Sequence, residues 1–196
     1  MENIMKTILF VDGRNFISKI ETILGSSNHK EDMDLSGYDF AGLLNKALSG
    51  IHIDRVIFYF GKLEKHAETE KKSVELIEEQ RLLKQHLERQ GFEVVFAGRV
   101  RGHTEKCFKG HETLTFKEKG VDVRIAVDMI TLAKDGKLKT AIIGSSDSDL
   151  QPAVHELGNQ KIERIYLGFE QQPNRGLSFT TDRTILIRNS EIEAGK

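Results

Sequence analysis

The chain has 196 residues, of which 38% are hydrophobic and 30% are charged. This length is enough for one hydrophobic core and too short for two. Its net charge of −1 excludes a broadly basic nucleic-acid-binding protein, so any contact with nucleic acid must come from a local basic patch. A single cysteine excludes an intrachain disulfide, and no stretch approaches the ~18 apolar residues of a membrane span, so a cytoplasmic protein is expected.

The strands predicted from the sequence are short apolar runs rich in β-branched and aromatic residues. In chain order they cover residues 7–11, 55–60, 93–97, 140–143, 164–167 and 184–187. Several are almost continuously apolar, as strands are when helices cover both faces of a parallel sheet. The first run ends directly at Asp12, which is typical of a strand and not of a signal peptide.

Helical patterns alternate with these strands. Apolar residues at helical spacing predict helices over residues 14–24, 40–48, 70–90, 121–133 and 150–157. The segment 121–133 is apolar almost all round, so we expect that helix to be deeply packed. The alternation predicts an α/β fold, a three-layer α/β/α sandwich with a mostly parallel, Rossmann-like sheet.

Two polar segments interrupt this alternation. Residues 25–37 read as a loop, and residues 98–119 form a longer excursion whose alternating apolar positions could make a small hairpin. The second segment directly precedes the helix that begins at residue 121. We therefore expect it to lie over the start of that helix, a position that binding loops often occupy. We expect one domain over residues 1–189 with an insertion over 98–119, followed by a frayed tail over 190–196.

Asp12 is the first candidate site residue. It precedes Gly13, whose missing side chain permits a tight turn and the close approach of a ligand. Asn15, three residues further on, can turn back toward Asp12 from the first helical turn. Two interpretations stay open, since Asp12 can cap the helix that begins at Arg14 or can belong to a functional site.

Asp147 and Asp149 form a second acidic motif, alternating with serines at the start of a helix. The free N–H groups and partial positive charge of a helix N-terminus keep such carboxylates ionised. Capping needs only one of them, so the second carboxylate indicates a further role.

Asp122 lies in the first turn of the apolar helix, and a charge on its buried face needs a partner or a metal ion. Asp128 lies on a different face of the same helix. Its expected role is support of the site or a simple salt bridge with Arg124, four residues earlier.

All four aspartates follow strand ends or begin helices. Active groups of open parallel sheets gather just past the carboxyl ends of the strands, so Asp12, Asp122, Asp147 and Asp149 are expected to meet in one crevice. Carboxylates packed together repel each other, and a hard cation relieves the repulsion. Oxygen-rich sites of this kind suit Mg²⁺ or Mn²⁺, which predicts metal-dependent chemistry on a phosphate.

A basic segment precedes Asp122 and is interleaved with Phe108 and Phe116. Its six basic residues are Arg99, Arg101, Lys106, Lys109, Lys117 and Lys119. Charges for phosphates and rings for bases are what single-stranded nucleic acid contacts, although a solvated surface loop explains the same composition. Arg14 and Lys62 could add charge at the same rim.

The sequence matches zinc binding, cysteine nucleophile chemistry and phosphatase chemistry less well. His103, Cys107 and His111 are spaced four apart, but they form a thin set for zinc beside two glycines, and nothing identifies a base for Cys107 as a nucleophile. Phosphatases of the haloacid dehalogenase type carry a second aspartate two residues after the first, where this chain has Arg14.

Three motifs carry a resemblance to a known family. VDGRN at 11–15, EKGVDVRIAVDM at 118–129 and GSSDSDLQP at 144–152 together resemble the NYN domain family, in the LabA-like branch of the PIN-like ribonuclease superfamily. The resemblance implies a PIN-like fold, a Mg²⁺ or Mn²⁺ site and RNA as substrate. The site residues it implies are Asp12, Asp122, Asp147 and Asp149 as the acidic cluster, Asn15 as their polar companion, and Ser146 and Asp128 as support.

The sequence therefore predicts a metal-dependent endoribonuclease in which a metal-activated water attacks the phosphorus and leaves 5′-phosphate and 3′-hydroxyl ends. Asp12 and Asp149 are the expected direct ligands, while Asp122 and Asp147 hold a second ion or orient the water. The alternative is a regulatory module that binds RNA or protein on the same fold and cleaves weakly or not at all.

Overall fold

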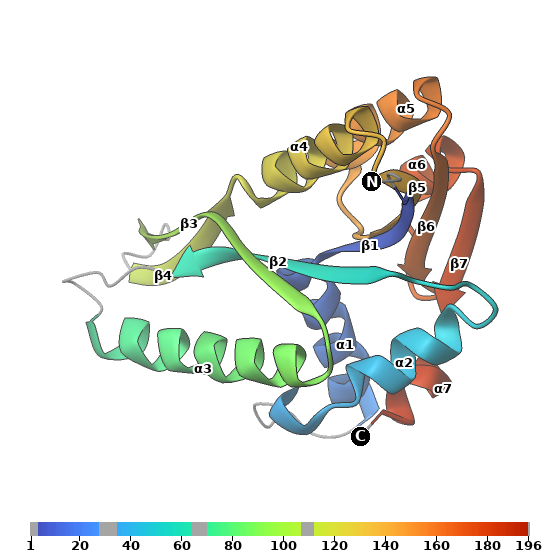
Figure 1. The fold of residues 1–196 in the computed structure, drawn as a ribbon. Coiled ribbons are helices and arrows are strands. Elements are labelled where there is room, and N and C mark those ends of the chain that lie inside the picture. Colours follow the sequence, from blue (N-terminus) through green and yellow to red (C-terminus); the bar gives the residue numbers. More distant parts are fainter. Residues whose placement is uncertain (1–3, 28–34, 64–69, 107–111, 196) are drawn as a thin grey trace.

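A seven-stranded sheet forms the centre of the molecule, in the order β4-β3-β2-β1-β5-β6-β7 (Figure 1). The computed structural model describes residues 4–27, 35–63, 70–106 and 112–195. The strands are β1 Lys6–Asp12, β2 Arg55–Leu63, β3 Glu93–Lys106, β4 Glu112–Lys119, β5 Leu138–Gly144, β6 Glu163–Phe169 and β7 Arg183–Ile187. All neighbouring strands pair in parallel except β3 and β4, which are antiparallel.

Helices cover both faces of the sheet, with α4, α5 and α6 on one face and α1, α2, α3 and α7 on the other (Figure 1). The helices are α1 Gly13–Ser27, α2 Phe40–Ala47, α3 Glu70–Arg89, α4 Val121–Lys134, α5 Gln151–Asn159, α6 Arg175–Thr180 and α7 Asn189–Glu193. Two 3₁₀ turns, η1 Leu35–Gly37 and η3 Ser148–Leu150, complete the described elements. The predicted three-layer α/β/α sandwich with a mostly parallel sheet is confirmed.

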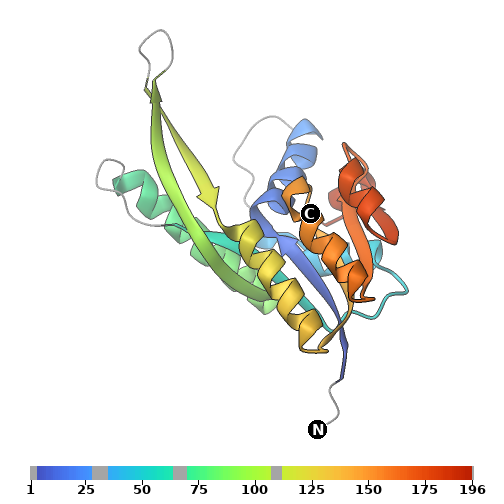
Figure 2. The same cartoon turned by 90° about the horizontal axis from the view of Figure 1, so that it is seen from above.

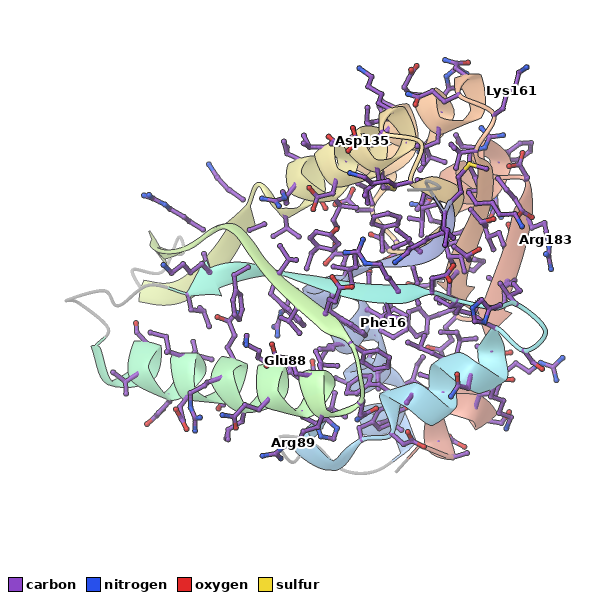
Figure 3. All side chains as sticks on the ribbon, in the orientation of Figure 1. Phe16, Glu88, Arg89, Asp135, Lys161 and Arg183 are labelled. Atoms are coloured by element: carbon purple, nitrogen blue, oxygen red, sulfur yellow. The ribbon has the colours of Figure 1, made fainter. Side chains whose placement is uncertain are left out.

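The core consists of two apolar layers, one on each face of the sheet. Along β1, Ile8 and Phe10 pack toward α4 and α5, while Leu9 and Val11 pack toward the opposite helices, and all four are fully buried. Successive side chains of a strand point to opposite faces, so a strand covered on both faces must be apolar throughout. Figure 3 shows Phe16 of α1 among the side chains that fill the second layer.

The direction of travel along the chain reverses between β1 and β5. From β1 the chain adds β2 and β3 on one side, and from β5 it adds β6 and β7 on the other. β1 and β5 are neighbours, and Val11 pairs with Gly144 near their carboxyl ends. Because the helices that follow the two strands leave to opposite faces, this switch point opens a crevice, the usual ligand position in such folds.

The segment predicted as a loop or hairpin is a hairpin of β3 and β4, and β3 runs on to Lys106 instead of ending at 97. Figure 2 shows this hairpin projecting beyond the body of the sheet. The pairing between β2 and β3 slips by one residue at Gly98, whose φ is +66°, and then continues to Leu63 and Val100. A Cβ at this position would overlap the carbonyl oxygen of Lys119.

Gly98→Ala is expected to lower the free energy of unfolding by about 1–3 kcal/mol, because alanine is strained at positive φ and has no room beside Lys119. Gly25→Ala is the matched control, since Gly25 lies on α1 with open space around it and alanine favours helix. Urea unfolding of both variants checks this, and equal stabilities would contradict it.

Helix α4 differs from its prediction as a deeply packed helix. Only Val121, Ile125 and Met129 form its buried stripe, whereas Val123 is 66% and Val127 53% exposed. The helix lies on the surface of the sheet, so residues at four-residue spacing turn inward and those between them face out.

The tail predicted over residues 190–196 is wrong for residues 190–193, which belong to helix α7, Asn189–Glu193. Ile192 is fully buried, and the Tyr38 hydroxyl donates a hydrogen bond to its carbonyl oxygen at 2.8 Å. Tertiary packing between α1 and α2 stabilises a helix too short to predict from its own residues. Helix α6 was also not predicted, for the same reason.

Candidate functional site

A pocket of about 350 Å³ opens at the switch point, beside the carboxyl ends of β1 and β5. Its lining residues are Asp12, Arg14, Asn15, Ser18, Lys19, Gly120, Val121, Asp122 and Asp147. Three of the four predicted cluster aspartates, together with Asn15 and Arg14, therefore share one cavity. Asp12, Arg14 and Asn15 lie more than a hundred residues before Asp122 and Asp147 in the chain, and the sheet topology brings the two groups together.

Asp12 combines both roles that the sequence left open. Its Oδ1 accepts a hydrogen bond from the backbone N–H of Asn15 at 3.1 Å, which caps helix α1. Its carboxylate, in a residue only 7% exposed, also lines the pocket. Gly13 is required here because a side chain at that position would overlap the ring of Phe60.

Asn15 joins the two sides of the switch point. Its side-chain oxygen accepts hydrogen bonds from the backbone N–H of Ser146 at 3.1 Å and from the Ser146 hydroxyl at 2.7 Å. Asn15 was expected to turn back toward Asp12, and its backbone does so, whereas its side-chain oxygen bonds the turn after β5. These contacts fix the turn that carries Asp147.

Asp147 and Asp149 occupy a short polar turn after β5. The Ser145 hydroxyl oxygen accepts from the backbone N–H of Asp147 at 3.0 Å, and Asp147 Oδ1 accepts from the N–H of Asp149 at 2.9 Å. Asp147 is therefore the cap of η3, and Asp149 is the carboxylate that capping does not need. The side chain of Asp149 is exposed at the rim and is not among the pocket-lining residues.

Asp122 gives the clearest electrostatic sign that these acids interact. Its pKa is raised above the ordinary value of 3.8, first by partial burial and then by the negative charges of Asp147 and Asp149. Asp122 therefore interacts with Asp147 and Asp149, while Asp12 lines the same pocket as Asp122 and Asp147. Repulsion within the cluster leaves Asp122 with uncompensated negative charge.

Asp122→Asn is expected to raise the melting temperature of the metal-free protein at pH 7. A raised folded-state pKa means that the folded protein holds this proton more tightly, a stabilising effect present below 3.8 and lost as pH rises through the raised pKa. At neutral pH the charged carboxylate therefore weakens folding, and asparagine removes the charge. Thermal unfolding at pH 7 and at about pH 3, where the difference should vanish, checks this. A variant less stable than wild type at pH 7 would contradict it.

Asp128 makes the salt bridge that the sequence allowed. Its Oδ1 pairs with Arg124 Nε at 2.8 Å, and its Oδ2 accepts a hydrogen bond from the Tyr59 hydroxyl at 3.1 Å. Burial and the charge of Asp128 raise the pKa of Tyr59, so this hydroxyl keeps its proton and holds α4 against β2. A supporting role for Asp128 in the site remains a prediction.

One wall of the pocket is cationic and comes from helix α1. Arg14, which was predicted, is joined by Ser18 and Lys19, which were not. Ser18 and Lys19 lie one helical turn after Arg14 and Asn15, so helical spacing from these two residues was the available signal. The cavity therefore has an acidic side and a basic side, an arrangement that suits a phosphate group bound next to a cation.

Asn174 was also missed, and it positions the acidic turn from outside the pocket. Its Nδ2 donates to the carbonyl oxygen of Ser146 at 2.8 Å, and its Oδ1 accepts from the N–H of Leu177 at 2.9 Å, where it caps α6. Its own N–H donates to the Tyr166 hydroxyl at 3.0 Å. No local motif marks Asn174, because its partner in the site lies 28 residues away.

The basic hairpin meets the pocket at its base. Arg99 stands opposite Lys119, and both are exposed, while Lys62 of β2 pairs in register with Arg99. Backbone register also places Arg101 opposite Lys117. Like charges at facing positions destabilise a strand pair, and a bound anion relieves them. Lys109 lies outside the described residues, as do the side chains of Arg101, Lys106 and Lys117.

The chemistry of the acidic cluster fits a hard divalent cation. Carboxylate oxygens are the preferred ligands of Mg²⁺ and Mn²⁺, and the raised pKa of Asp122 marks charge that a cation would offset. Within the described ranges, no three His, Cys, Asp or Glu side chains stand close enough to form a ready-made ion-binding group. The zinc set that the sequence disfavours includes Cys107 and His111, which lie outside those ranges. No helix in the described part of the chain is long and apolar enough to cross a membrane.

The fold and the site define an α/β protein of the PIN-like type, with acidic residues at the switch point of a mostly parallel sheet. The family model of the NYN domain matches residues 6–188, so the chain belongs to the NYN domain family, a PIN-like nuclease family. Nucleases of this kind usually need divalent metal ions.

One solved structure supports the fold independently. A protein of unknown function from Vibrio parahaemolyticus is similar in structure, with a TM-score of 0.58 and 17% sequence identity over 95% of each chain. At this identity the similarity shows the fold alone. No curated protein matches the chain.

Proposed function

We propose that this protein is a metal-dependent endoribonuclease that hydrolyses RNA phosphodiesters. The observation that carries the proposal is the acidic pocket at the switch point, lined by Asp12, Asp122 and Asp147 and bordered by Asp149. Family membership supports nuclease chemistry on RNA. Because the three sequence motifs resemble the LabA-like branch, we further propose that the chain belongs to it, and a cytoplasmic location remains a prediction.

The aspartates are proposed to hold the metal and handle protons. Asp12 and Asp149 are the proposed direct ligands, with Asp122 and Asp147 holding a second ion or orienting water. When bound, Mg²⁺ or Mn²⁺ lowers the pKa of water and offsets the charge that develops on the phosphate. The carboxylate of Asp122, with its raised pKa, is suited to accept a proton from the attacking water.

The cationic groups are proposed to bind the RNA backbone. Arg14 and Lys19 line the pocket and would hold the phosphate next to the acidic cluster. The base of the hairpin, with Arg99 and Lys119, would bind phosphates of the same strand further along. A single strand is the proposed substrate because it can bend into a pocket of this size.

A labelled single-stranded RNA, incubated with the protein in Mn²⁺, Mg²⁺ or EDTA, tests this function. We expect cleavage with either ion and none in EDTA, giving 5′-phosphate and 3′-hydroxyl ends. A 2′,3′-cyclic phosphate, or equal cutting in EDTA, would reject the mechanism.

One observation favours a second candidate, a regulatory module that binds RNA or protein without efficient cleavage. Among the described residues the acids are gathered but do not form a ready-made ion-binding group. Salt-sensitive RNA binding by a folded protein that leaves the RNA intact in every metal, and that survives Asp12→Asn, would support this candidate.

A further inference from the structure

The peptide groups on both sides of Ser146 are held by two asparagine side chains from distant elements. Asn15 of α1 accepts hydrogen bonds from the backbone N–H of Ser146 at 3.1 Å and from its hydroxyl at 2.7 Å. Asn174, the cap of α6, donates through Nδ2 to the carbonyl oxygen of Ser146 at 2.8 Å. This carbonyl belongs to the planar peptide that leads into Asp147, so Asn174 fixes the backbone from which the Asp147 side chain departs.

Helix α6 is anchored firmly at the end that carries Asn174. The N–H of Asn174 donates to the hydroxyl of Tyr166 at 3.0 Å, and Tyr166 is fully buried. Leu177, whose N–H donates to Asn174 Oδ1 at 2.9 Å, is also fully buried, in the core layer that includes residues of α5. A Cβ at Gly176 would overlap a side chain of α5, so the two helices approach each other closely. The side chain of Asn174 therefore reaches Ser146 from a fixed support.

The turn that Asn174 holds carries like charges that repel a neighbour. Partial burial, and then the negative charges of Asp147 and Asp149, raise the pKa of Asp122. A carboxylate that is free to move relieves such repulsion by swinging away, and a cation must then draw it back. Holding the turn in place removes this cost, because a ligand group that is already positioned loses little conformational freedom when the ion binds.

We propose that Asn174 is a positioning residue that sets the affinity of the acidic site for Mn²⁺ or Mg²⁺ by holding the peptide between Ser146 and Asp147 against this repulsion. The inference rests on the proposed function, because metal binding at these aspartates is part of it. It assigns control of metal affinity to α6, a helix that none of the three sequence motifs includes.

Asn174→Ser separates the two tasks of this side chain. Serine caps helices as well as asparagine does, so the N–H of Leu177 keeps its partner, but the single hydroxyl engaged at the cap cannot also replace Nδ2. Free Mn²⁺ measured by electron paramagnetic resonance gives the dissociation constant of the ion that Asp12→Asn fails to bind. We expect this constant to rise about 10- to 100-fold in Asn174→Ser, the usual cost of losing a group that orients metal ligands. Asn174→Thr, with another capping residue, should behave in the same way.

Thr181→Val is the matched control. The Thr181 hydroxyl donates to the carbonyl oxygen of Leu177 at 2.8 Å near the other end of α6, so the variant loses one hydrogen bond of the same helix without touching the acidic turn. It should bind Mn²⁺ as tightly as wild type. Without metal, Asn174→Ser and Thr181→Val should both melt within about 2–4 °C of wild type. RNA cleavage by Asn174→Ser should recover as Mn²⁺ is raised to saturation, since the lost step is binding of the ion.

The outcomes separate this inference from the proposed function. If Asn174→Ser binds Mn²⁺ as tightly as wild type, the positioning role is wrong and the nuclease proposal stands. If Asn174→Ser and Thr181→Val lose affinity equally, α6 acts only through its stability, and the inference is overturned. If only Asn174→Ser loses affinity but wild type cleaves no RNA, the inference holds and the nuclease proposal fails. If wild type binds no Mn²⁺ that depends on Asp12, both are wrong.

Discussion

Asp12→Asn is expected to lower metal-dependent RNA cleavage by about a thousandfold or more, since metal-assisted charge stabilisation supplies several kcal/mol. Asparagine keeps a side-chain oxygen that can still accept from the N–H of Asn15, so the cap of α1 survives. The substitution removes only the negative charge in the pocket. Loss of activity therefore would not come from unfolding, and the melting temperature should stay close to that of wild type.

The matched control is Asp135→Asn, at the end of α4 opposite Asp122 (Figure 3). Asp135 pairs with Lys137 on the surface at 2.8 Å, away from the carboxyl ends of the strands. Single-turnover cleavage of labelled RNA should be unaffected in this variant. Wild-type rates for Asp12→Asn in both Mn²⁺ and Mg²⁺ would remove Asp12 from the mechanism.

Phe16→Ala is expected to lower the free energy of unfolding by about 3–5 kcal/mol. Phe16 is fully buried in α1, and its ring centroid lies 5.0 Å from that of Phe169 and 6.3 Å from that of Phe58. Truncation leaves a cavity beside the rings of Phe58 and Phe169 that the surrounding strands cannot close. Because Phe16 follows Asn15, the same change would also loosen the helix start that holds the site.

The same substitution at Phe179 provides the control, because that ring is 93% exposed. Phe179→Ala should change stability by less than about 0.5 kcal/mol, as substitutions at exposed positions do. Urea unfolding followed by circular dichroism measures both variants with one protocol. Equal losses in the two variants would show that burial does not determine these stabilities.

The central strands could be predicted from the sequence because they must bury both of their faces. Leu9 and Phe10, for example, pack on opposite sides of β1, so the run had to be apolar throughout. Helix α4 was placed correctly but its packing was not. An apolar sequence does not specify which side faces the sheet, and the exposure of Val123 and Val127 follows from the position of the helix on the outside.

The extent of the β3–β4 hairpin and the two short C-terminal helices could not be predicted in the same way. The strand continues because Gly98, at positive φ, accommodates a one-residue slip against β2, which no periodicity reveals. Helices α6 and α7 are too short to be stable alone and depend on Leu177 and Ile192 being buried by distant elements.

For the site, the sequence by itself determined which residues carry charge and where each stands relative to a strand end. Asp12 and Asp147 could be assigned to one crevice because each follows the carboxyl end of a parallel strand, and these ends share an edge. Asp122 joins them because the antiparallel β4 returns the chain to the base of the hairpin. Only the tertiary structure decided what surrounds them. Asn15 accepts a hydrogen bond from Ser146, and Asn174 donates one to the same residue, although both partners lie far away in the chain. Lys19 faces the pocket because of its position on helix α1. Such contacts depend on side-chain distances of a few ångströms. The order of residues in the chain does not specify these distances, because they are set by the packing of the two core layers.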